Sequence, residues 1–312
     1  MASKQQTAQL TVQALQRACG LALVYAVLIL VLPVSQATIQ TYYLSPLEYR
    51  AILFIVSLPS IVAWIAAFIG YAKLREYVSL VRKTPEGTHL DKLATGCAWL
   101  AWSLPATTIL SLLLNAIANQ HPAFYSTSII SVNYLGLLLP LVAFSIIGVA
   151  SRGLVNLAKL RLSRASIRVI MLFFLAAGIL YCYLIFQRFD MTSLSSTQNP
   201  YFLPIWLMVL SVIVPYLYVW FIGLLAAYEI TLFSQQTDGV LYRQALRLLV
   251  LGLVVIIISS IVLQYINGIQ PRVGRLMFGY HLVLVSIFRL IGGSGFIALA
   301  IGANRLKKIE EI

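Results

Sequence analysis

Charged side chains are scarce in this sequence, and long apolar runs dominate it. Only 10% of its 312 residues are Asp, Glu, Lys or Arg, whereas 61% are hydrophobic. Soluble domains usually contain roughly 25% charged residues. A chain this apolar could not cover its hydrophobic surface in water. The composition therefore excludes a soluble protein and indicates one that spans a membrane.

The motifs of common enzymes and cofactor sites are also missing. The three cysteines form no CxxC pair, and the sequence has no HExxH zinc motif and no phosphate-binding P-loop. Of the three histidines only His281 falls inside an expected membrane span, whereas haem would need two at matched depth. We therefore expect no catalytic residue, no metal and no cofactor, which makes an enzyme the least favoured class.

Eight apolar stretches are long enough to cross a bilayer, because each exceeds the roughly 20 residues that a helix needs for a ~30 Å hydrocarbon core. Each span should be helical, since unsatisfied backbone groups cost several kcal/mol in hydrocarbon. The expected spans are 14–36, 48–72, 93–118, 126–151, 166–187, 202–231, 243–266 and 276–303. The predicted fold class is an all-α membrane protein with eight transmembrane helices and no soluble domain.

Basic residues are concentrated at one side of these spans. The 22 Lys and Arg outnumber the 9 Asp and Glu, and most lie within 73–92, 152–168, 243–247 and 305–308. The positive-inside rule then predicts that both termini are cytoplasmic. Contact with anionic lipid heads at the inner face explains the net charge of +13, so no nucleic-acid partner is expected. The short loops and the excess of basic residues on one side favour a location in the plasma membrane, as the inner membrane of a prokaryote.

The second half of the chain resembles the first. A proline precedes a tryptophan by five residues in both halves, at Pro59 with Trp64 and at Pro215 with Trp220. We interpret residues 1–160 and 161–312 as a tandem repeat of four helices. Because the first and fifth spans cross in the same direction, the two halves are expected to be parallel repeats, an arrangement found in transporters.

Arg289 is the most unusual residue of the last span. Thirteen residues separate it from Arg275 and fifteen from Arg305, and fifteen helical residues rise only about 22 Å. Arg289 should therefore lie within the bilayer, towards its outer third. A charged residue there is a functional candidate, here for binding an anionic solute. The alternative is that its side chain extends towards the interface or bonds a neighbouring carbonyl.

A run of small residues follows three positions later, at Gly292, Gly293, Ser294 and Gly295. This run could break the helix and present backbone N–H groups to an anion beside Arg289. It could equally let two helices pack closely. We assign Arg289 and these four residues to a candidate substrate-binding site.

Two further sets of polar residues fall inside spans. Asn115 and Gln264 occupy matching positions in the third and seventh spans, as interhelical hydrogen-bonding groups or as part of an outer vestibule. Glu229 lies nine residues before Asp238 in a turn and Arg247 nine after it, so an antiparallel hairpin would place them at equal depth. We predict a buried Glu229–Arg247 ion pair, since an unpaired charge there is costly.

These features favour a transporter or channel for a small solute or ion, with its site between the halves. The alternative is a non-catalytic membrane protein: a scaffold, a subunit of a larger complex, or a sensor. Expected partners are membrane lipids, a small anionic solute, and an oligomer or complex partner.

Overall fold

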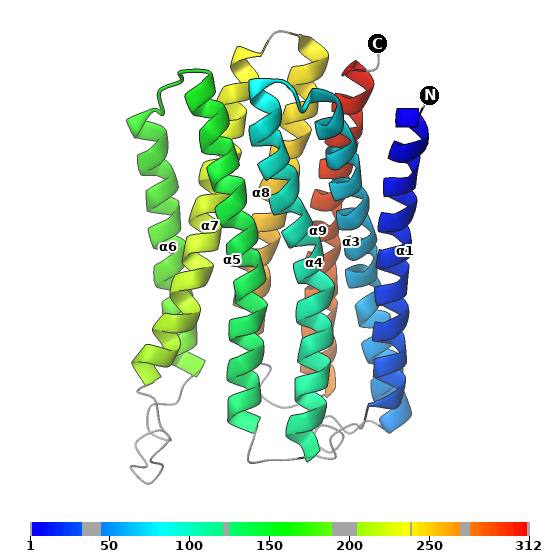
Figure 1. Ribbon diagram of the computed structural model, residues 1–312. Coiled ribbons are helices and arrows are strands. Elements are labelled where there is room, and N and C mark those ends of the chain that lie inside the picture. The colour runs from blue at the N-terminus through cyan, green and yellow to red at the C-terminus, as the bar shows by residue number, and fades with distance from the viewer. Residues whose placement is uncertain are drawn as a thin grey trace.

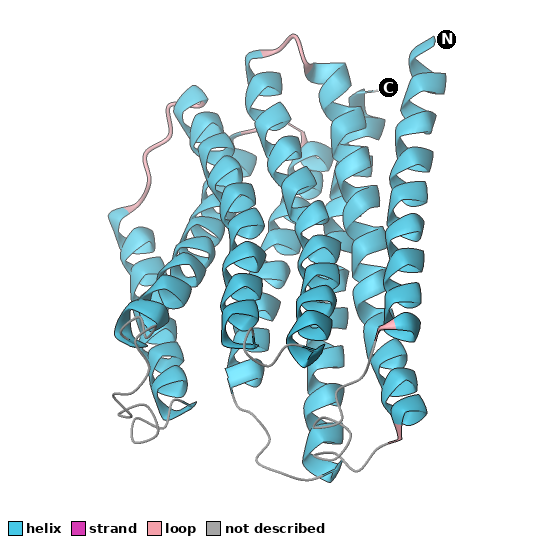
Figure 2. Cartoon of the chain, turned by 60° about the horizontal axis from the view of Figure 1, so that its bottom comes forward, coloured by secondary structure: helices cyan, strands magenta, loops and turns pink. Residues whose placement is uncertain are grey.

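The computed structural model describes residues 2–32, 45–120, 125–188, 205–237, 239–268 and 275–310, which form eight α-helices and no strand (Figure 2). Each helix overlaps one of the eight expected spans. The helices are α1 (Ala2–Val31), α3 (Pro46–Val81), α4 (Pro85–Gln120), α5 (Tyr125–Leu157), α6 (Arg164–Arg188), α7 (Ile205–Gln236), α8 (Val240–Gly268) and α9 (Arg275–Glu310).

Seven of these helices are long and apolar enough to cross a membrane, and α6, with 25 residues, is not among the seven. The prediction of an all-helical, multi-pass membrane protein is therefore confirmed, whereas the eighth span stays a prediction. Both chain ends lie at the same end of the bundle (Figure 1).

Six helices form a closed ring in which each contacts its two neighbours. The order round the ring follows the chain: α3, α4, α5, α7, α8, α9 and back to α3. The helices α1 and α6 lie outside this ring, near opposite edges of the bundle, with α1 packed on α3 and α6 packed on α7 (Figure 1). The two predicted halves therefore meet at two seams, α5 against α7 and α9 against α3.

Local sequence explains where two of the helices begin. Ser45 caps α3, because its hydroxyl accepts a hydrogen bond from the backbone N–H of Glu48 while the Glu48 carboxylate accepts one from Ser45. Pro85 opens α4 at a position where its missing N–H costs nothing, and the preceding Thr84 hydroxyl accepts a bond from Gly87. The helices nevertheless continue through their internal prolines, including Pro59 and Pro140.

Glycines allow the closest helix approaches within the ring. A Cβ atom on Gly252 of α8 would lie 2.6 Å from the carbonyl oxygen of Gly295 on α9. A Cβ atom on Gly96 of α4 would lie 2.5 Å from a side-chain carbon of Ile147 on α5. Both distances are too short for any larger residue, so the hairpins α4–α5 and α8–α9 are each held in backbone-close contact.

Among the described residues, many side chains at the end that holds the two termini are completely buried. Fully buried side chains there include Tyr77 near the end of α3, Leu90 near the start of α4, and Leu306 near the end of α9. They belong to one apolar cluster that extends through all six ring helices. The hollow part of the ring therefore lies away from the termini.

Candidate functional site

A cavity of about 370 Å³ lies inside the ring. All six ring helices line it, three from each predicted half, and within the described residues α1 and α6 contribute nothing to the lining. Its volume corresponds to about a dozen water molecules at ~30 Å³ each, or to one small organic molecule. The cavity therefore lies between the two predicted halves.

Aromatic side chains form the end of the cavity that faces the buried core. Trp64 on α3 and Trp220 on α7 are almost completely buried, and Phe144 on α5 and Phe296 on α9 lie beside them in the lining. Tyr216 adds a further ring at 5.9 Å from Trp220. This end of the cavity therefore has few groups that could replace the hydration shell of an ion.

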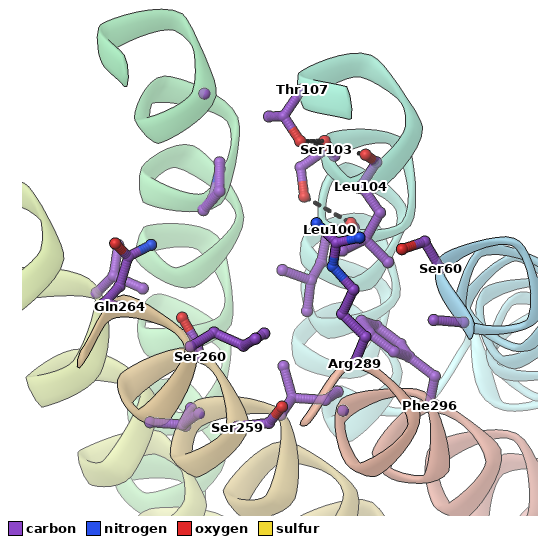
Figure 3. A pocket seen from close by; sticks show the side chains of 18 of the residues that line it. Ser60, Leu100, Ser103, Leu104, Thr107, Ser259, Ser260, Gln264, Arg289 and Phe296 are labelled. Carbon is purple, nitrogen blue, oxygen red and sulfur yellow. Dashed lines mark hydrogen bonds between the residues drawn. The ribbon is translucent and has the colours of Figure 1, made fainter. Parts of the chain in front are cut away.

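Hydroxyl groups line the remaining wall, and most of their hydrogens are already donated to backbone carbonyls. Ser103 donates to Leu100 at 2.7 Å and Thr107 to Ser103 at 2.8 Å, both within α4 (Figure 3). Ser259 of α8 donates across to a carbonyl oxygen of α9. What these hydroxyls still offer to a bound molecule is acceptor capacity, because each oxygen has a second lone pair.

Arg289 supplies the positive charge of the cavity. It lines the cavity from α9, is half-buried, and extends from the α9 backbone into the open space (Figure 3). Within the described part of the chain, no other Lys, Arg, Asp or Glu is part of the lining. Among the residues that the structure describes, the guanidinium group forms no hydrogen bond and no salt bridge. An arginine inside a membrane helix is costly, so one that faces a cavity without a protein partner is suited to an anion.

The run of small residues after Arg289 does not break the helix. The helix α9 continues from Arg275 to Glu310, so the backbone N–H groups of Gly292–Gly295 remain within it, and the hypothesis of an anion-binding break is wrong. Gly292 and Gly293 line the cavity, whereas Gly295 packs against α8 and Ser294 is exposed. The Ser294 hydroxyl donates to Ile291 of its own helix. The small residues instead allow close packing of neighbouring helices, since Gly293 lies against Ala63 of α3 and Gly295 against Gly252 of α8.

Of the two polar residues predicted inside the third and seventh spans, Asn115 and Gln264, the structure describes the side chain of Gln264 only. Gln264 lines the cavity and its side chain is hydrogen-bonded to Tyr216 of α7. It therefore acts as an interhelical bonding group and as a wall of the cavity at once. The side chain of Asn115 lies outside the described part of the structure.

Glu229 is buried and paired, but its partner is not the predicted one. Its carboxylate accepts hydrogen bonds from the Ser151 hydroxyl at 2.6 Å and from Arg152 at 3.1 Å, both on α5. Arg247 is exposed and forms no salt bridge with Glu229 within the described residues. The prediction considered only the hairpin neighbour α8, whereas the buried face of α7 at this depth is turned towards α5.

Glu76 on α3 has a corresponding position at the other seam. Its side chain is completely buried and accepts bonds from Thr11 at 2.6 Å, Lys307 at 2.9 Å and Lys73 at 3.1 Å. Lys307 belongs to α9, so at each seam one buried carboxylate on one predicted half is bonded to a residue of the other predicted half. The sequence gives little signal for this network, because Thr11 and Lys307 are 65 and 231 residues from Glu76.

The aromatic lining was not assigned to a site from the sequence, although Pro59 with Trp64 and Pro215 with Trp220 marked both positions. Among the described residues, no group of three or more His, Cys, Asp or Glu could hold a metal ion. In the comparisons with known proteins, no family model, no curated protein and no solved structure matches this chain.

Proposed function

We propose that this protein is an eight-span membrane transporter that binds a small anionic solute in the cavity between its two halves. One observation carries the proposal: Arg289, an arginine within a membrane helix, faces a cavity at the centre of the helix ring and forms no hydrogen bond or salt bridge with the described residues, although the Tyr25 ring of α1 lies near it. A structural arginine would be expected to end on a carboxylate or a carbonyl group. This one is available to a ligand.

The lining positions support a site that is shared by two repeated halves. Each lining position of α3 and α4 falls on a lining position of α7 or α8 that lies 156 residues further along the chain. These pairs are Ser60–Tyr216, Ala63–Val219, Trp64–Trp220, Leu100–Ile256, Ser103–Ser259, Leu104–Ser260, Thr107–Leu263 and Thr108–Gln264. For α5 and α9 the offset is 152, with the pairs Leu137–Arg289, Pro140–Gly292 and Phe144–Phe296. In this register Gln264 corresponds to Thr108 and not to Asn115.

The closest helix contacts support the same register without reference to the cavity. Gly96 approaches Ala143 and Ile147 across the α4–α5 hairpin. Moving these positions by the two offsets leads to Gly252, Gly295 and Leu299, which are the residues in closest approach across the α8–α9 hairpin. The helix contacts correspond as well, since α3 meets α9 where α7 meets α5. We therefore take residues 1–160 and 161–312 to be parallel repeats.

The proposed access to the cavity is from the outer face. The dense core and the two seam carboxylates, Glu76 and Glu229, lie between the cavity and the end that holds both termini. The basic residues of that end favour its placement on the cytoplasmic side, next to anionic lipid heads. Transport would then require the seams α3–α9 and α5–α7 to open at that end, as in proteins whose repeats rock about a central site. A prokaryotic inner membrane remains the proposed location.

The test is ligand-dependent stability of the purified full-length protein, followed by uptake. Thermal unfolding is measured with chloride, phosphate and short organic acids as their sodium salts. We expect at least one anion to raise the unfolding temperature of the unmodified protein. Arg289→Gln should weaken that binding at least tenfold, since a hydrogen bond to a charged group contributes about 1.5–3 kcal/mol.

Arg247→Gln is the matched control, because it removes the same group from an exposed position. The stabilising anion is then offered in labelled form to proteoliposomes that contain either variant. Stabilisation that Arg289→Gln leaves unchanged would contradict the proposed site. A protein that no anion stabilises, and that takes up none, would fit the alternative of a scaffold or a subunit of a larger complex.

A further inference from the structure

The matched lining pairs show where the cavity departs from its own symmetry. Most pairs combine chemically similar residues, such as Trp64 with Trp220 or Phe144 with Phe296. The pair Leu137 and Arg289 differs most, because one member is apolar and the other carries a full charge. Leu137 on α5 is almost completely buried, at 3% exposure, and lines the same cavity.

The approximate two-fold relation of the repeats places these two residues on opposite sides of the cavity. The Arg289 side is therefore positive, whereas the Leu137 side is apolar. Between them the aromatic end of the cavity, with Trp64 and Trp220, continues the apolar surface. A ligand that fits this distribution needs an anionic group at one end only.

We propose that the ligand is an organic monoanion: a carboxylate, or a similar singly charged group, on an apolar body. This inference rests on the proposed function and specifies its substrate class. The charged group binds Arg289, and the body lies against Leu137 and the aromatic end. A small inorganic anion would meet apolar walls that cannot replace its hydration shell, and the second charge of a dianion would lie beside Leu137 without a partner.

The geometry also accounts for the hydroxyl groups along α4. Their hydrogens are bonded to backbone carbonyls, as at Ser103 and Thr107, so their oxygens act as acceptors. Acceptor oxygens repel a second carboxylate but accept a hydroxyl or N–H group of the ligand body. This α4 wall, which belongs neither to the helix of Arg289 nor to that of Leu137, therefore tolerates a donor of the ligand body and disfavours a second anion.

The experiment compares probes that differ in one property at a time, with the purified full-length protein in detergent. Acetate, butyrate and hexanoate differ in apolar length, adipate adds a second carboxylate to a six-carbon chain, and phosphate has no apolar body. We expect affinity to rise about fourfold for each methylene that enters the apolar region. Hexanoate should bind more than about tenfold tighter than adipate or phosphate.

Two variants separate the site from unspecific partitioning of longer acids into detergent. Arg289→Leu should abolish saturable binding of both acetate and hexanoate, because it removes the group that binds their shared carboxylate, whereas partitioning into detergent would be the same in this variant. The double variant Leu137→Arg with Arg289→Leu moves the charge to the symmetry-related position. It should restore hexanoate binding to within about tenfold of the unmodified protein. The approximate two-fold rotation that relates the repeats would place the positive charge and the apolar wall in exchanged positions, with the same distance between them.

The outcomes distinguish this inference from the function on which it rests. If hexanoate, adipate and phosphate bound with equal affinity and all lost binding in Arg289→Leu, the proposed substrate class would be overturned. The proposed function, transport of a small anion, would still stand. Binding of none of the probes, or binding unchanged in Arg289→Leu, would overturn the proposed function itself. The chain-length series needs no variant, so the inference can be refuted even if the double variant fails to fold.

Discussion

The two seam carboxylates should differ in how much they stabilise the protein, although both are buried and paired. The Glu76 side chain is 0% exposed, and its two cationic partners, Lys73 and Lys307, are 23% and 15% exposed. Glu229 is 2% exposed, but its partner Arg152 is 53% exposed. Removing the charge of Glu76 would therefore leave two largely buried ammonium groups. Removing that of Glu229 would leave one guanidinium that can reach water or lipid heads.

The expected magnitudes follow from these surroundings. Breaking a buried pair by removing one partner costs about 3–5 kcal/mol, because the other charge stays buried. Glutamine at position 76 keeps one acceptor oxygen for Thr11 or a lysine, so we expect Glu76→Gln to cost about 3 kcal/mol. Glutamine at position 229 can keep the bond to Ser151, and a half-exposed pair contributes about 1 kcal/mol or less. The expected difference between the two variants is about 2 kcal/mol.

The assay is thermal unfolding of the purified variants in one detergent and at one scan rate, because unfolding of such a protein is expected to be irreversible. Asp91→Asn serves as the control, since Asp91 pairs with Arg75 at 2.7 Å on the surface, where both side chains are about 40% exposed. We expect the unfolding temperature to fall most for Glu76→Gln, less for Glu229→Gln and least for Asp91→Asn. A loss at Glu229 that equals or exceeds the loss at Glu76 would refute the reasoning from partner exposure.

Three further predictions concern packing, topology and the small-residue run. Gly252→Ala should destabilise the protein more than Gly96→Ala, within the usual range of about 1–3 kcal/mol for overpacking. The new methyl group would lie 2.6 Å from the backbone oxygen of Gly295 in the first case, whereas in the second the nearest backbone oxygen, that of Ala143, is 3.0 Å away and the closer atom belongs to the Ile147 side chain. Equal unfolding temperatures would contradict this. A C-terminal fluorescent-protein fusion should fluoresce in bacterial cells and a C-terminal alkaline phosphatase fusion should be inactive, and the reverse result would place the termini outside. Ser294→Ala should leave both the unfolding temperature and anion binding unchanged, since its hydroxyl bonds only its own helix and is exposed; a loss of binding would return this residue to the site.

The sequence predicts the membrane helices well, because length and apolarity alone decide whether a segment can span a bilayer. It also predicts that Arg289 is inside the membrane, since the distances along one helix to Arg275 and Arg305 require it. The direction in which the Arg289 side chain points could not be predicted. Whether the side chain meets a cavity depends on α3, α4 and α5, which are far away in the chain.

The wrong partner for Glu229 and the rejected alternative of a break in α9 have a common physical origin, and the other alternative for the small residues, close helix packing, agrees with the structure. Glu229 was paired with its hairpin neighbour Arg247, but the seam brings Arg152 of the other half closer. The run from Gly292 to Gly295 suggested a broken helix, but its small size is complemented by Gly252 on one side and Ala63 on another. In both cases the decisive neighbour lies in a different helix, and a single sequence contains no record of which faces meet.

The pairing of Glu76 with Lys307 has a consequence for how the chain is made. The two residues are 231 positions apart, and Lys307 lies in the last helix. At a synthesis rate of about 5–20 residues per second, Glu76 enters the membrane roughly 10–50 s before this partner exists. During that interval the Glu76 carboxylate, which is completely buried in the finished protein, lacks one of its two cationic partners. A chain that stops short of α9 would keep this defect, because Lys307 of α9 is one of the three groups that donate to the Glu76 carboxylate.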